Sequence, residues 1–115
     1  MIIKSGKPSQ NPANEKPVEI LEKFIGVFVS KGWLNQPLRI RHRDRRYHIS
    51  CSENKFFAYR INDNARIPPG FPGWPVCIIT SDHMIDDATI SAFVSTEPSV
   101  HEWLRCFQDG DFEWM

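Results

Sequence analysis

The sequence has no long apolar segment of the kind that crosses a membrane. Its longest apolar run covers residues 24–29 and is far shorter than the ~20 residues that a membrane-spanning helix needs. The opening residues, Met-Ile-Ile-Lys-Ser-Gly-Lys-Pro-Ser-Gln, lack the apolar core of a secretory leader. We therefore expect no leader and no membrane association, with the cytoplasm as the compartment.

Cysteine is scarce, and its spacing argues against two common roles of this residue in small proteins. The chain holds three cysteines, Cys51, Cys77 and Cys106, whose odd number and wide spacing argue against a disulfide framework and for a reducing compartment. No cysteine or histidine pair has the close spacing of zinc ligands. His48 and Cys51 come nearest, but their offset along a strand places them on opposite faces. We expect no bound metal ion and no cofactor.

The sequence also lacks a motif of a known catalytic mechanism. Gly70 and Gly73 sit between prolines, which have no backbone amide to offer a phosphate group. Cys77, Asp82 and His83 come nearest to a thiol nucleophile with a base. However, Cys77 lies in an apolar run, where a cysteine typically behaves as a small buried hydrophobic residue. We assign no catalytic residue and keep a thiol enzyme centred on Cys77 as an alternative.

The net charge of zero hides a strong asymmetry along the chain. Residues 1–60 carry twelve Lys and Arg against five Asp and Glu, whereas residues 61–115 carry two against nine. The two halves therefore have charges of +7 and −7. They either neutralise each other when the chain folds, or form faces that meet partners of opposite sign.

The length of 115 residues fits one domain that folds on its own. Residues 1–14 are polar, with almost nothing to bury, and are interpreted as a flexible arm that precedes a globular domain over residues 15–115. A helix is predicted over residues 15–31, with Asn14 as its cap and Gly32 at its end. Apolar residues surround most of this helix, so it is either central in the domain or shared with a second chain, as in a homodimer.

The middle of the chain alternates with a period of two, which predicts strands. In residues 38–43 the alternation places arginines on one side, so this strand is expected to have a charged outer face. Polar segments at residues 43–44 and 52–54 suit reversals between antiparallel strands. A three-stranded meander is therefore predicted within residues 37–62.

A proline-rich segment follows the meander. Residues 67–75 are predicted to form a rigid, irregular loop that cannot pair within a sheet, and residues 76–80 a short buried strand. Residues 89–95 fit either a strand or a short helix. The preceding Asp86 and Asp87 are interpreted as a helix start.

A second helix is predicted near the carboxyl end. Thr96 is a suitable cap, and the apolar spacing over residues 100–107 is that of a core-facing helix that ends at Gly110. Residues 111–115 alternate acidic and apolar types and are expected to dock on the domain. The sequence thus predicts an α+β fold, with an antiparallel sheet of about four to five strands flanked by an N-terminal and a C-terminal helix. This order is similar to that of small secretion-chaperone folds, although the proline-rich segment departs from it and no motif assigns a family.

One segment concentrates positive charge beside aromatic side chains. Arginine binds carboxylates and phosphates through two parallel hydrogen bonds, and a neighbouring tyrosine can stack on a base. Three interpretations stay open: a solvated strand face that the acidic half neutralises, a site for an acidic protein, and a site for nucleic acid. The candidate residues of this segment are Arg39, Arg41, Arg43, Arg45, Arg46 and Tyr47.

Two aromatic residues of the proline-rich segment are further candidates for binding. Phe71 and Trp74 stand on a stiff backbone, which loses little entropy on binding and therefore suits interface anchors. The same rings could instead fill the core of their own domain or cover a sheet edge. Both interpretations remain open.

These observations favour a non-enzymatic protein that acts by binding another protein, of the inhibitor, immunity-protein or adaptor kind. The arginines would steer an acidic surface of that partner, with Phe71 and Trp74 as anchors. The alternatives are a nucleic-acid-binding protein that uses residues 39–46, and a small thiol enzyme centred on Cys77.

Overall fold

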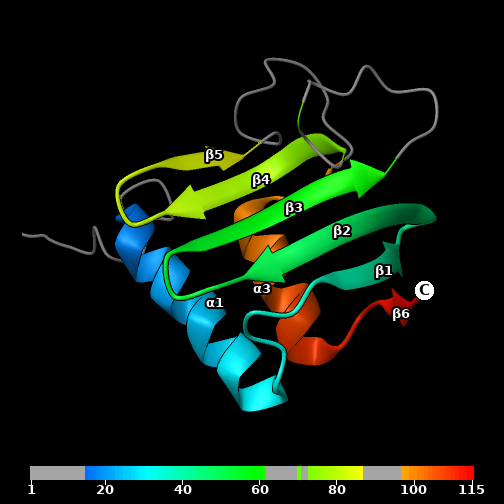
Figure 1. The fold of residues 1–115 in the computed structure, drawn as a ribbon, viewed down its shortest axis with the longest axis horizontal. Coiled ribbons are helices and arrows are strands. Elements are labelled where there is room, and N and C mark those ends of the chain that lie inside the picture. The colour runs from blue at the N-terminus through cyan, green and yellow to red at the C-terminus, as the bar shows by residue number, and fades with distance from the viewer. Residues whose placement is uncertain (1–14, 62–69, 71–72, 87–96) are drawn as a thin grey trace, which may run out of the picture.

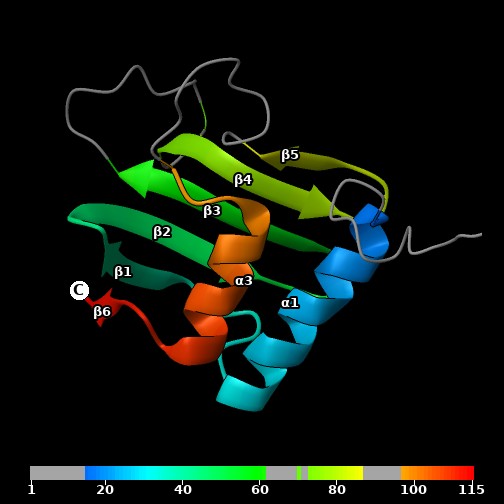
Figure 2. The ribbon, with the colours of Figure 1, turned by 180° about the vertical axis from the view of Figure 1, so that it is seen from behind.

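In the part of the chain that the structure describes, two helices cover one face of a six-stranded antiparallel sheet (Figure 1), and they lie in front of the sheet when the molecule is seen from behind (Figure 2). This computed structural model describes residues 15–61, 70, 73–86 and 97–115. The α+β fold with a helix toward each end of the chain is confirmed, with more strands than the four to five expected. Neither helix in this part of the chain has the length and apolar character needed to cross a membrane.

The strands follow each other in the sheet in an order close to that of the chain. The order is β5-β4-β3-β2-β1-β6, so each of the first five strands pairs with its sequence neighbours and the carboxyl end returns to pair with β1. The predicted meander is confirmed as β1, β2 and β3. The strands are β1 (Leu38–His42), β2 (Arg45–Cys51), β3 (Lys55–Ile61), β4 (Trp74–Thr80), β5 (Met84–Asp86) and β6 (Glu113–Trp114).

The turn between β1 and β2 uses two residues in an uncommon conformation. Arg43 and Asp44 have φ angles of 54° and 62°, and they connect the paired residues His42 and Arg45. Positive φ at both central residues matches the twist of two-residue hairpins, although glycine and asparagine adopt it at lower cost. The turn therefore takes Arg43 out of the strand in which sequence alternation had placed it.

Helix α1 (Pro17–Lys31) packs on the sheet through one side. Its cap is Lys16 rather than Asn14, which lies outside the described residues, and it ends at Gly32 as predicted, with a left-handed φ of 76°. Val18 and Val29 are 37% and 57% exposed, so the helix is not central in the domain as one interpretation had it. Use of its outer side by a second copy stays a prediction. The buried residues of α1 are Ile20, Leu21, Phe24 and Phe28.

Helix α3 (Val100–Asp109) presents a more strictly amphipathic face. Its cap is Ser99 rather than Thr96, because the Ser99 hydroxyl accepts a hydrogen bond from the Glu102 amide while the Glu102 carboxylate accepts one from the Ser99 amide. Gly110 ends the helix as predicted, with φ 71°. The buried residues of α3 are Val100, Trp103, Leu104, Cys106 and Phe107.

Strand β4 starts earlier than expected, which corrects the prediction that residues 67–75 cannot pair. Trp74 pairs with Arg60 and Pro75 with Tyr59, next to an irregularity in the register. Proline is tolerated at such irregularities because the ladder hydrogen bonding is already interrupted there. Gly73 approaches β3 so closely that an added Cβ would lie 2.4 Å from the carbonyl oxygen of Arg60. The strand predicted over residues 76–80 is confirmed within β4.

The remaining predictions concern Asp86 and Asp87, the carboxyl-terminal segment, and residues 1–14 and 89–95. Asp86 is the last residue of strand β5, and the residues after it, over which the interpreted helix would run, lie outside the described residues. The carboxyl-terminal segment docks as predicted, because β6 pairs with β1 and Phe112 packs against the core. The predictions for residues 1–14 and 89–95, together with Asp87, lie outside the described residues.

Aromatic rings fill the layer between the helices and the sheet. Phe24 of α1 stacks on Phe56 of β3 with ring centroids 4.1 Å apart, and Phe28 meets Phe107 of α3 edge to face. Trp103 packs edge to face on Tyr47 at 4.8 Å. Such pairs add to the hydrophobic stabilisation from burial and hold both helices on the same side of the sheet.

Candidate functional site

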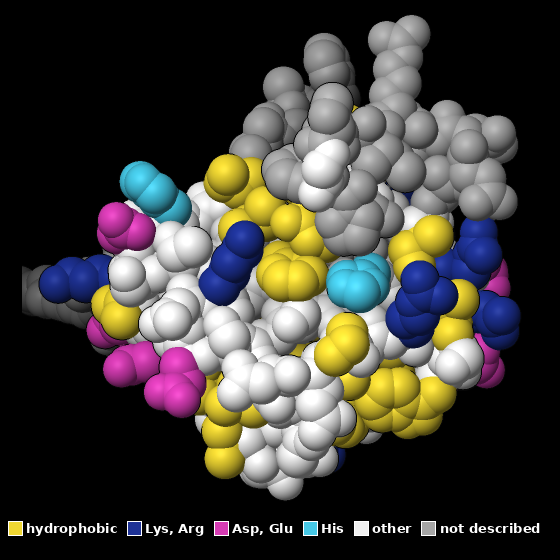
Figure 3. Space-filling view, viewed as in Figure 1, with side chains coloured by type: hydrophobic (Ala, Val, Ile, Leu, Met, Phe, Trp, Pro, Cys, Tyr) yellow, Lys and Arg dark blue, Asp and Glu magenta, His cyan; other side chains and the backbone are white. Residues whose placement is uncertain are grey.

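The side of the sheet that faces away from the helices carries both positive charge and apolar side chains (Figure 3). Because strand side chains alternate between the two faces, the register and the burial pattern assign each strand residue to one of them. We call this side the open face. Its strand residues are Arg39, Arg41, Arg46, His48, Ser50, Lys55, Phe57, Tyr59, Ile61, Pro75, Ile78, Thr80, Ile85 and Glu113.

Strands β1 and β2 place arginine and histidine side chains opposite each other. Arg41 lies directly opposite Arg46, and Arg39 lies opposite His48. Like charges directly opposite in an antiparallel sheet are destabilising. The alternation of β1 predicted the outward position of Arg39 and Arg41, and the structure confirms it.

Negative charge is sparse on the open face. The carboxylate of Glu113 lies 3.2 Å from Arg41, but the two side chains are 71% and 53% exposed, so the ion pair is weak. No other Asp or Glu belongs to the open face as defined, and no ion pair to Arg39 is found within the described part of the chain. Asp and Glu side chains gather toward the margins of Figure 3. The described strand residues of the open face therefore carry a net positive charge.

Strands β3 to β5 contribute an apolar area beside the arginines. Phe57 lies opposite Ile78, which in turn lies opposite Ile85, and Ile85 is 47% exposed. Phe57 and Ile78 are half-buried. The Lys55 ammonium lies 5.4 Å from the centroid of the Phe57 ring, a favourable cation–π distance.

His48 marks the boundary between the charged and the apolar areas. Its ring is parallel to that of Phe57 within 6°, with centroids 6.0 Å apart. Partial burial, followed by the charge of Arg39, lowers the pKa of His48 below its usual value. The imidazole is therefore neutral near pH 7 and contributes an aromatic surface rather than a charge.

Three of the residues predicted for this site lie elsewhere. Arg43 sits in the β1–β2 turn, where its guanidinium is 3.1 Å from the Glu102 carboxylate. Arg45 points to the helix side and pairs with Glu97 at 3.1 Å. Tyr47 is fully buried, so its ring does not offer a stacking surface to a base. Of the predicted arginines, Arg39, Arg41 and Arg46 thus share the open face.

A buried carboxylate explains the position of Arg45 and Tyr47. The side chain of Glu97 is only 3% exposed and accepts a hydrogen bond of 2.7 Å from the Tyr47 hydroxyl. The guanidinium groups of Arg45 and Arg60 both pair with it. Burial and the neighbouring carboxylate raise the pKa of Tyr47. This cluster joins β2 and β3 to the segment that leads into α3, and we assign it to stability.

The two aromatic candidates of the proline-rich segment are only partly described. Trp74 is the first residue of β4 and is 37% exposed, so its side chain is neither buried in the core nor fully exposed. By its pairing with Arg60 it belongs to the helix side of the sheet and not to the open face. Phe71 lies outside the described residues.

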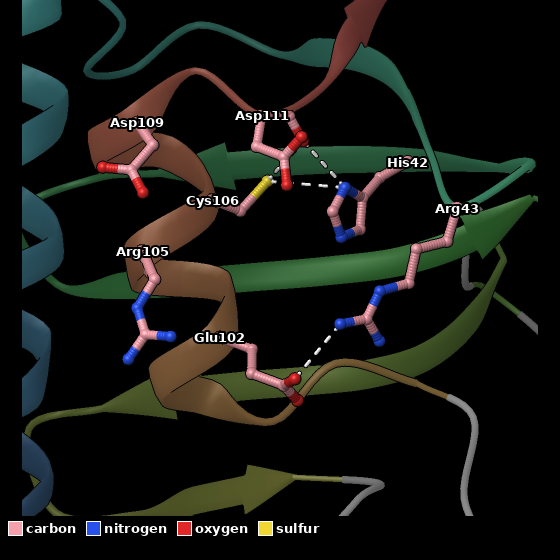
Figure 4. A pocket seen from close by; sticks show the side chains of 7 residues that line it. All are labelled: His42, Arg43, Glu102, Arg105, Cys106, Asp109 and Asp111. Carbon is pink, nitrogen blue, oxygen red and sulfur yellow. Dashed lines mark hydrogen bonds and ion pairs between the residues drawn. The ribbon is translucent and has the colours of Figure 1, made fainter.

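A small hollow lies between α3 and the β1–β2 turn (Figure 4). It has a volume of about 150 Å³ and is lined by His42, Arg43, Glu102, Arg105, Cys106, Asp109 and Asp111. The Nδ1 atom of His42 lies 2.8 Å from the Asp111 carbonyl oxygen, and because a carbonyl only accepts, Nδ1 carries the proton. That nitrogen lies 3.8 Å from the Cys106 sulfur and cannot act as a base toward it.

Two of the three thiols are unsuited to nucleophilic chemistry. Burial, with a contribution from Asp111, raises the pKa of Cys106 to about 12, and burial alone raises that of Cys51 to about 12. A thiol with such a pKa is protonated at neutral pH and is a poor nucleophile. Cys77 is buried and lies opposite Asp86 in the register of strands β4 and β5, whereas His83 lies at the exposed tip of the β4–β5 hairpin. The structure therefore does not bring His83 to Cys77.

Sequence reasoning missed the apolar part of the open face. The signal was present in β3, whose sequence Lys-Phe-Phe-Ala-Tyr-Arg-Ile places apolar residues at consecutive positions and hence on both faces. A strand with two apolar faces needs a cover on each side. Ile85 carried no comparable signal, because β5 is only three residues long.

No family model, no curated protein and no solved structure matches the chain. Within the described residues, no group of three or more His, Cys, Asp or Glu side chains is placed to hold a metal ion. The functional argument therefore rests on the geometry and charge of the open face.

Proposed function

We propose that this chain is a non-enzymatic protein of the inhibitor, immunity-protein or adaptor kind, and that its open face binds an acidic surface of another protein. The observation that carries the proposal is the placement of Arg39, Arg41 and Arg46 on one face with a single carboxylate, Glu113, among its strand residues. A partner that supplies carboxylates would pair with Arg39, for which the described residues provide no ion pair, and would add to the exposed pair of Arg41 and Glu113.

The apolar area gives this face a second property of protein interfaces. A typical interface combines a dehydrated apolar centre with a polar, charged rim. Phe57, Ile78 and Ile85 would form the centre and the arginines the rim. The raised pKa values of Cys51 and Cys106 and the burial of Cys77 support a binding role over a catalytic one, and the three free cysteines support a reducing compartment such as the cytoplasm.

Nucleic acid is the second candidate partner, and one observation favours it. The parallel rings of His48 and Phe57 lie beside Arg39 and Lys55, and single-stranded nucleic acid binds through base stacking combined with contacts between cations and phosphates. Tyr59 adds little to such a platform because it is only 4% exposed. Displaced counterions would make this binding fall steeply with salt.

A pull-down from the native host lysate, with and without nuclease, tests the proposal. The tagged wild-type chain should retain a stoichiometric protein after nuclease treatment, and Arg39→Glu should lose most of it. Arg105→Glu makes the same charge change on an exposed position of α3, away from the open face, and should retain the protein. Loss of the bound proteins after nuclease treatment would indicate that the open face binds nucleic acid. Equal retention of the protein by Arg39→Glu and Arg105→Glu would show that the open face is not the binding site.

A further inference from the structure

The open face is divided into two halves of different chemistry, and the division runs along the strands. The half on β1 and β2 holds Arg39, Arg41 and Arg46, of which Arg39 and Arg41 are exposed. The half on β3 to β5 is dominated by apolar side chains, among which Ile85 is the most exposed large one. Figure 3 shows hydrophobic side chains over the middle of the sheet and cationic ones mainly toward the β1 edge, while Lys55 on β3 adds a cation beside Phe57.

The two halves would act on a partner through different forces. Exposed arginines attract carboxylates over several ångströms, and salt screens this attraction. An apolar area binds by releasing water on contact, which depends little on salt and mainly slows dissociation. A partner that contacted only one half of the open face would leave the other half exposed to water, and that half would add nothing to the affinity.

From this division we infer that the partner presents an acidic cluster directly beside an apolar cluster, and that its binding segment crosses the strands with the carboxylates over β1 and β2. This inference rests on the proposed function and adds the kind of partner surface and its orientation. Charge complementarity fixes the orientation, because the reverse placement would set carboxylates over Phe57 and Ile78 and apolar groups over the exposed Arg39.

The width of the sheet sets the size of that segment. Neighbouring strands lie ~4.8 Å apart, so the four intervals from β1 to β5 span about 19 Å. A helix of about 13 residues, with a rise of 1.5 Å per residue, covers this distance. A partner helix would then carry its acidic residues in one half of its length and its apolar residues in the other.

The chain's own carboxyl end shows the acidic part of this pattern. Glu113 pairs with Arg41 at 3.2 Å while β6 runs beside β1. Glu113 contacts Arg41 from the edge of the sheet, and both side chains stay exposed. Carboxylates of a partner can therefore contact Arg41 as well. Arg39 and Arg46 lie on the same face, on β1 and β2.

Crosslinking in the full-length chain tests the inference. A photoreactive phenylalanine analogue is placed at position 39 in one variant and at position 85 in another, and each is irradiated in nuclease-treated host lysate. The crosslinked partner peptides are then sequenced. We expect both positions to label one protein, with Asp- and Glu-rich residues attached to position 39 and apolar residues attached to position 85.

Affinities for the identified partner supply the second arm. Arg39→Gln should weaken binding about tenfold at about 50 mM salt and less than about twofold at about 500 mM, because the lost attraction is screened. Ile85→Ser should weaken binding about tenfold at both salt concentrations. Val29→Ser, on the exposed side of α1, is the matched control and should leave affinity unchanged.

The outcomes separate the inference from the proposed function. Labelling at position 39 alone, or equal salt responses of Arg39→Gln and Ile85→Ser, overturns the two-part partner while leaving an acidic protein partner in place. Reversed chemistry at the two positions overturns the orientation. Labelling of nucleic acid, of a second copy of this chain, or of nothing contradicts the proposed function and the inference together.

Discussion

Arg41 lies directly opposite Arg46 across the β1–β2 hairpin, and both side chains project from the face that the helices leave uncovered. Like charges directly opposite in a sheet repel each other. Arg41 already has one carboxylate, Glu113, at 3.2 Å, and this ion pair is exposed. Under the proposed function, an acidic partner would add further carboxylates on this face.

His48 should make partner binding depend on pH. Its pKa is depressed by burial and by Arg39, so it is neutral in the free protein near pH 7. Carboxylates from a partner would favour the protonated imidazole, so affinity should rise several-fold as the pH falls from about 7 to about 5.5. His48→Gln should flatten this response, whereas His83→Gln, at the exposed β4–β5 turn, should preserve it in a titration of affinity against pH.

The same group affects the stability of the free protein with the opposite sign. Because the folded pKa lies below the unfolded value of about 6.5, the unfolded chain takes up the proton first. The contribution of His48 is therefore fully present above about pH 6.5 and is lost as the pH falls through that value toward the folded pKa. A His48→Gln variant that loses stability over this window as steeply as the wild type would show that another group is responsible.

Glu97→Gln should destabilise the fold strongly. The substitution keeps a hydrogen-bond acceptor for Tyr47 but removes the negative charge between Arg45 and Arg60. The two guanidinium groups are only 33% and 25% exposed, so we expect a loss of about 2–4 kcal/mol in the free energy of unfolding, measured with denaturant. The control Glu102→Gln breaks an exposed ion pair with Arg43 and should lower the free energy of unfolding by less than about 1 kcal/mol. Equal losses in the two variants would contradict a structural role of the buried Glu97 cluster.

Two glycines should respond in opposite directions to alanine. At Gly73 the new Cβ would lie 2.4 Å from the backbone oxygen of Arg60, so β4 must shift and stability should fall by about 1–3 kcal/mol. At Gly26, inside α1, no atom lies within 4 Å of the new Cβ, and alanine should add up to about 1 kcal/mol through its helix propensity. Thermal unfolding of both variants measures the contrast, and a neutral Gly73→Ala would contradict the close approach.

The cysteines should resist alkylation in the native protein. All three are buried, and the pKa values of Cys51 and Cys106 are raised to about 12. At about pH 7.5 iodoacetamide should modify them at least a hundredfold more slowly than in the unfolded chain, because burial blocks access to all three and Cys51 and Cys106 also lack the thiolate form. Mass spectrometry of the labelled protein gives the rates. Rapid labelling of Cys77 would revive the thiol-enzyme alternative.

The alternation of apolar and polar residues along the sequence was sufficient to predict much of the sheet but less of the composition of its open face. In β1 charged and apolar residues alternate strictly, so both the strand and the outward position of Arg39 and Arg41 follow from the sequence. In β2, Tyr47 alternates with the apolar Ile49 and Cys51, a pattern that indicates the core side, but its arginine neighbours led to its wrong assignment as an exposed stacking residue. Charge density along the chain was a poorer guide than alternation.

Other features depend on contacts that sequence patterns do not reveal. The pairing of Trp74 and Pro75 with β3 depends on the close approach of Gly73 to Arg60, between residues distant in sequence. The cap of α3 moved to Ser99 because its reciprocal hydrogen bonds with Glu102 outweigh the plain propensity of Thr96. The turn conformation of Arg43 follows from the length of the connection between β1 and β2.

The central claim, that the open face binds an acidic protein, is tested most directly by one comparison of dissociation constants. The wild-type chain, Arg39→Glu and Arg105→Glu are titrated against the protein captured from nuclease-treated lysate, with circular dichroism to confirm that each variant is folded. We predict that Arg39→Glu weakens binding at least about tenfold, which corresponds to about 1.4 kcal/mol, while Arg105→Glu binds like the wild type. Wild-type affinity of the folded Arg39→Glu variant would contradict the claim.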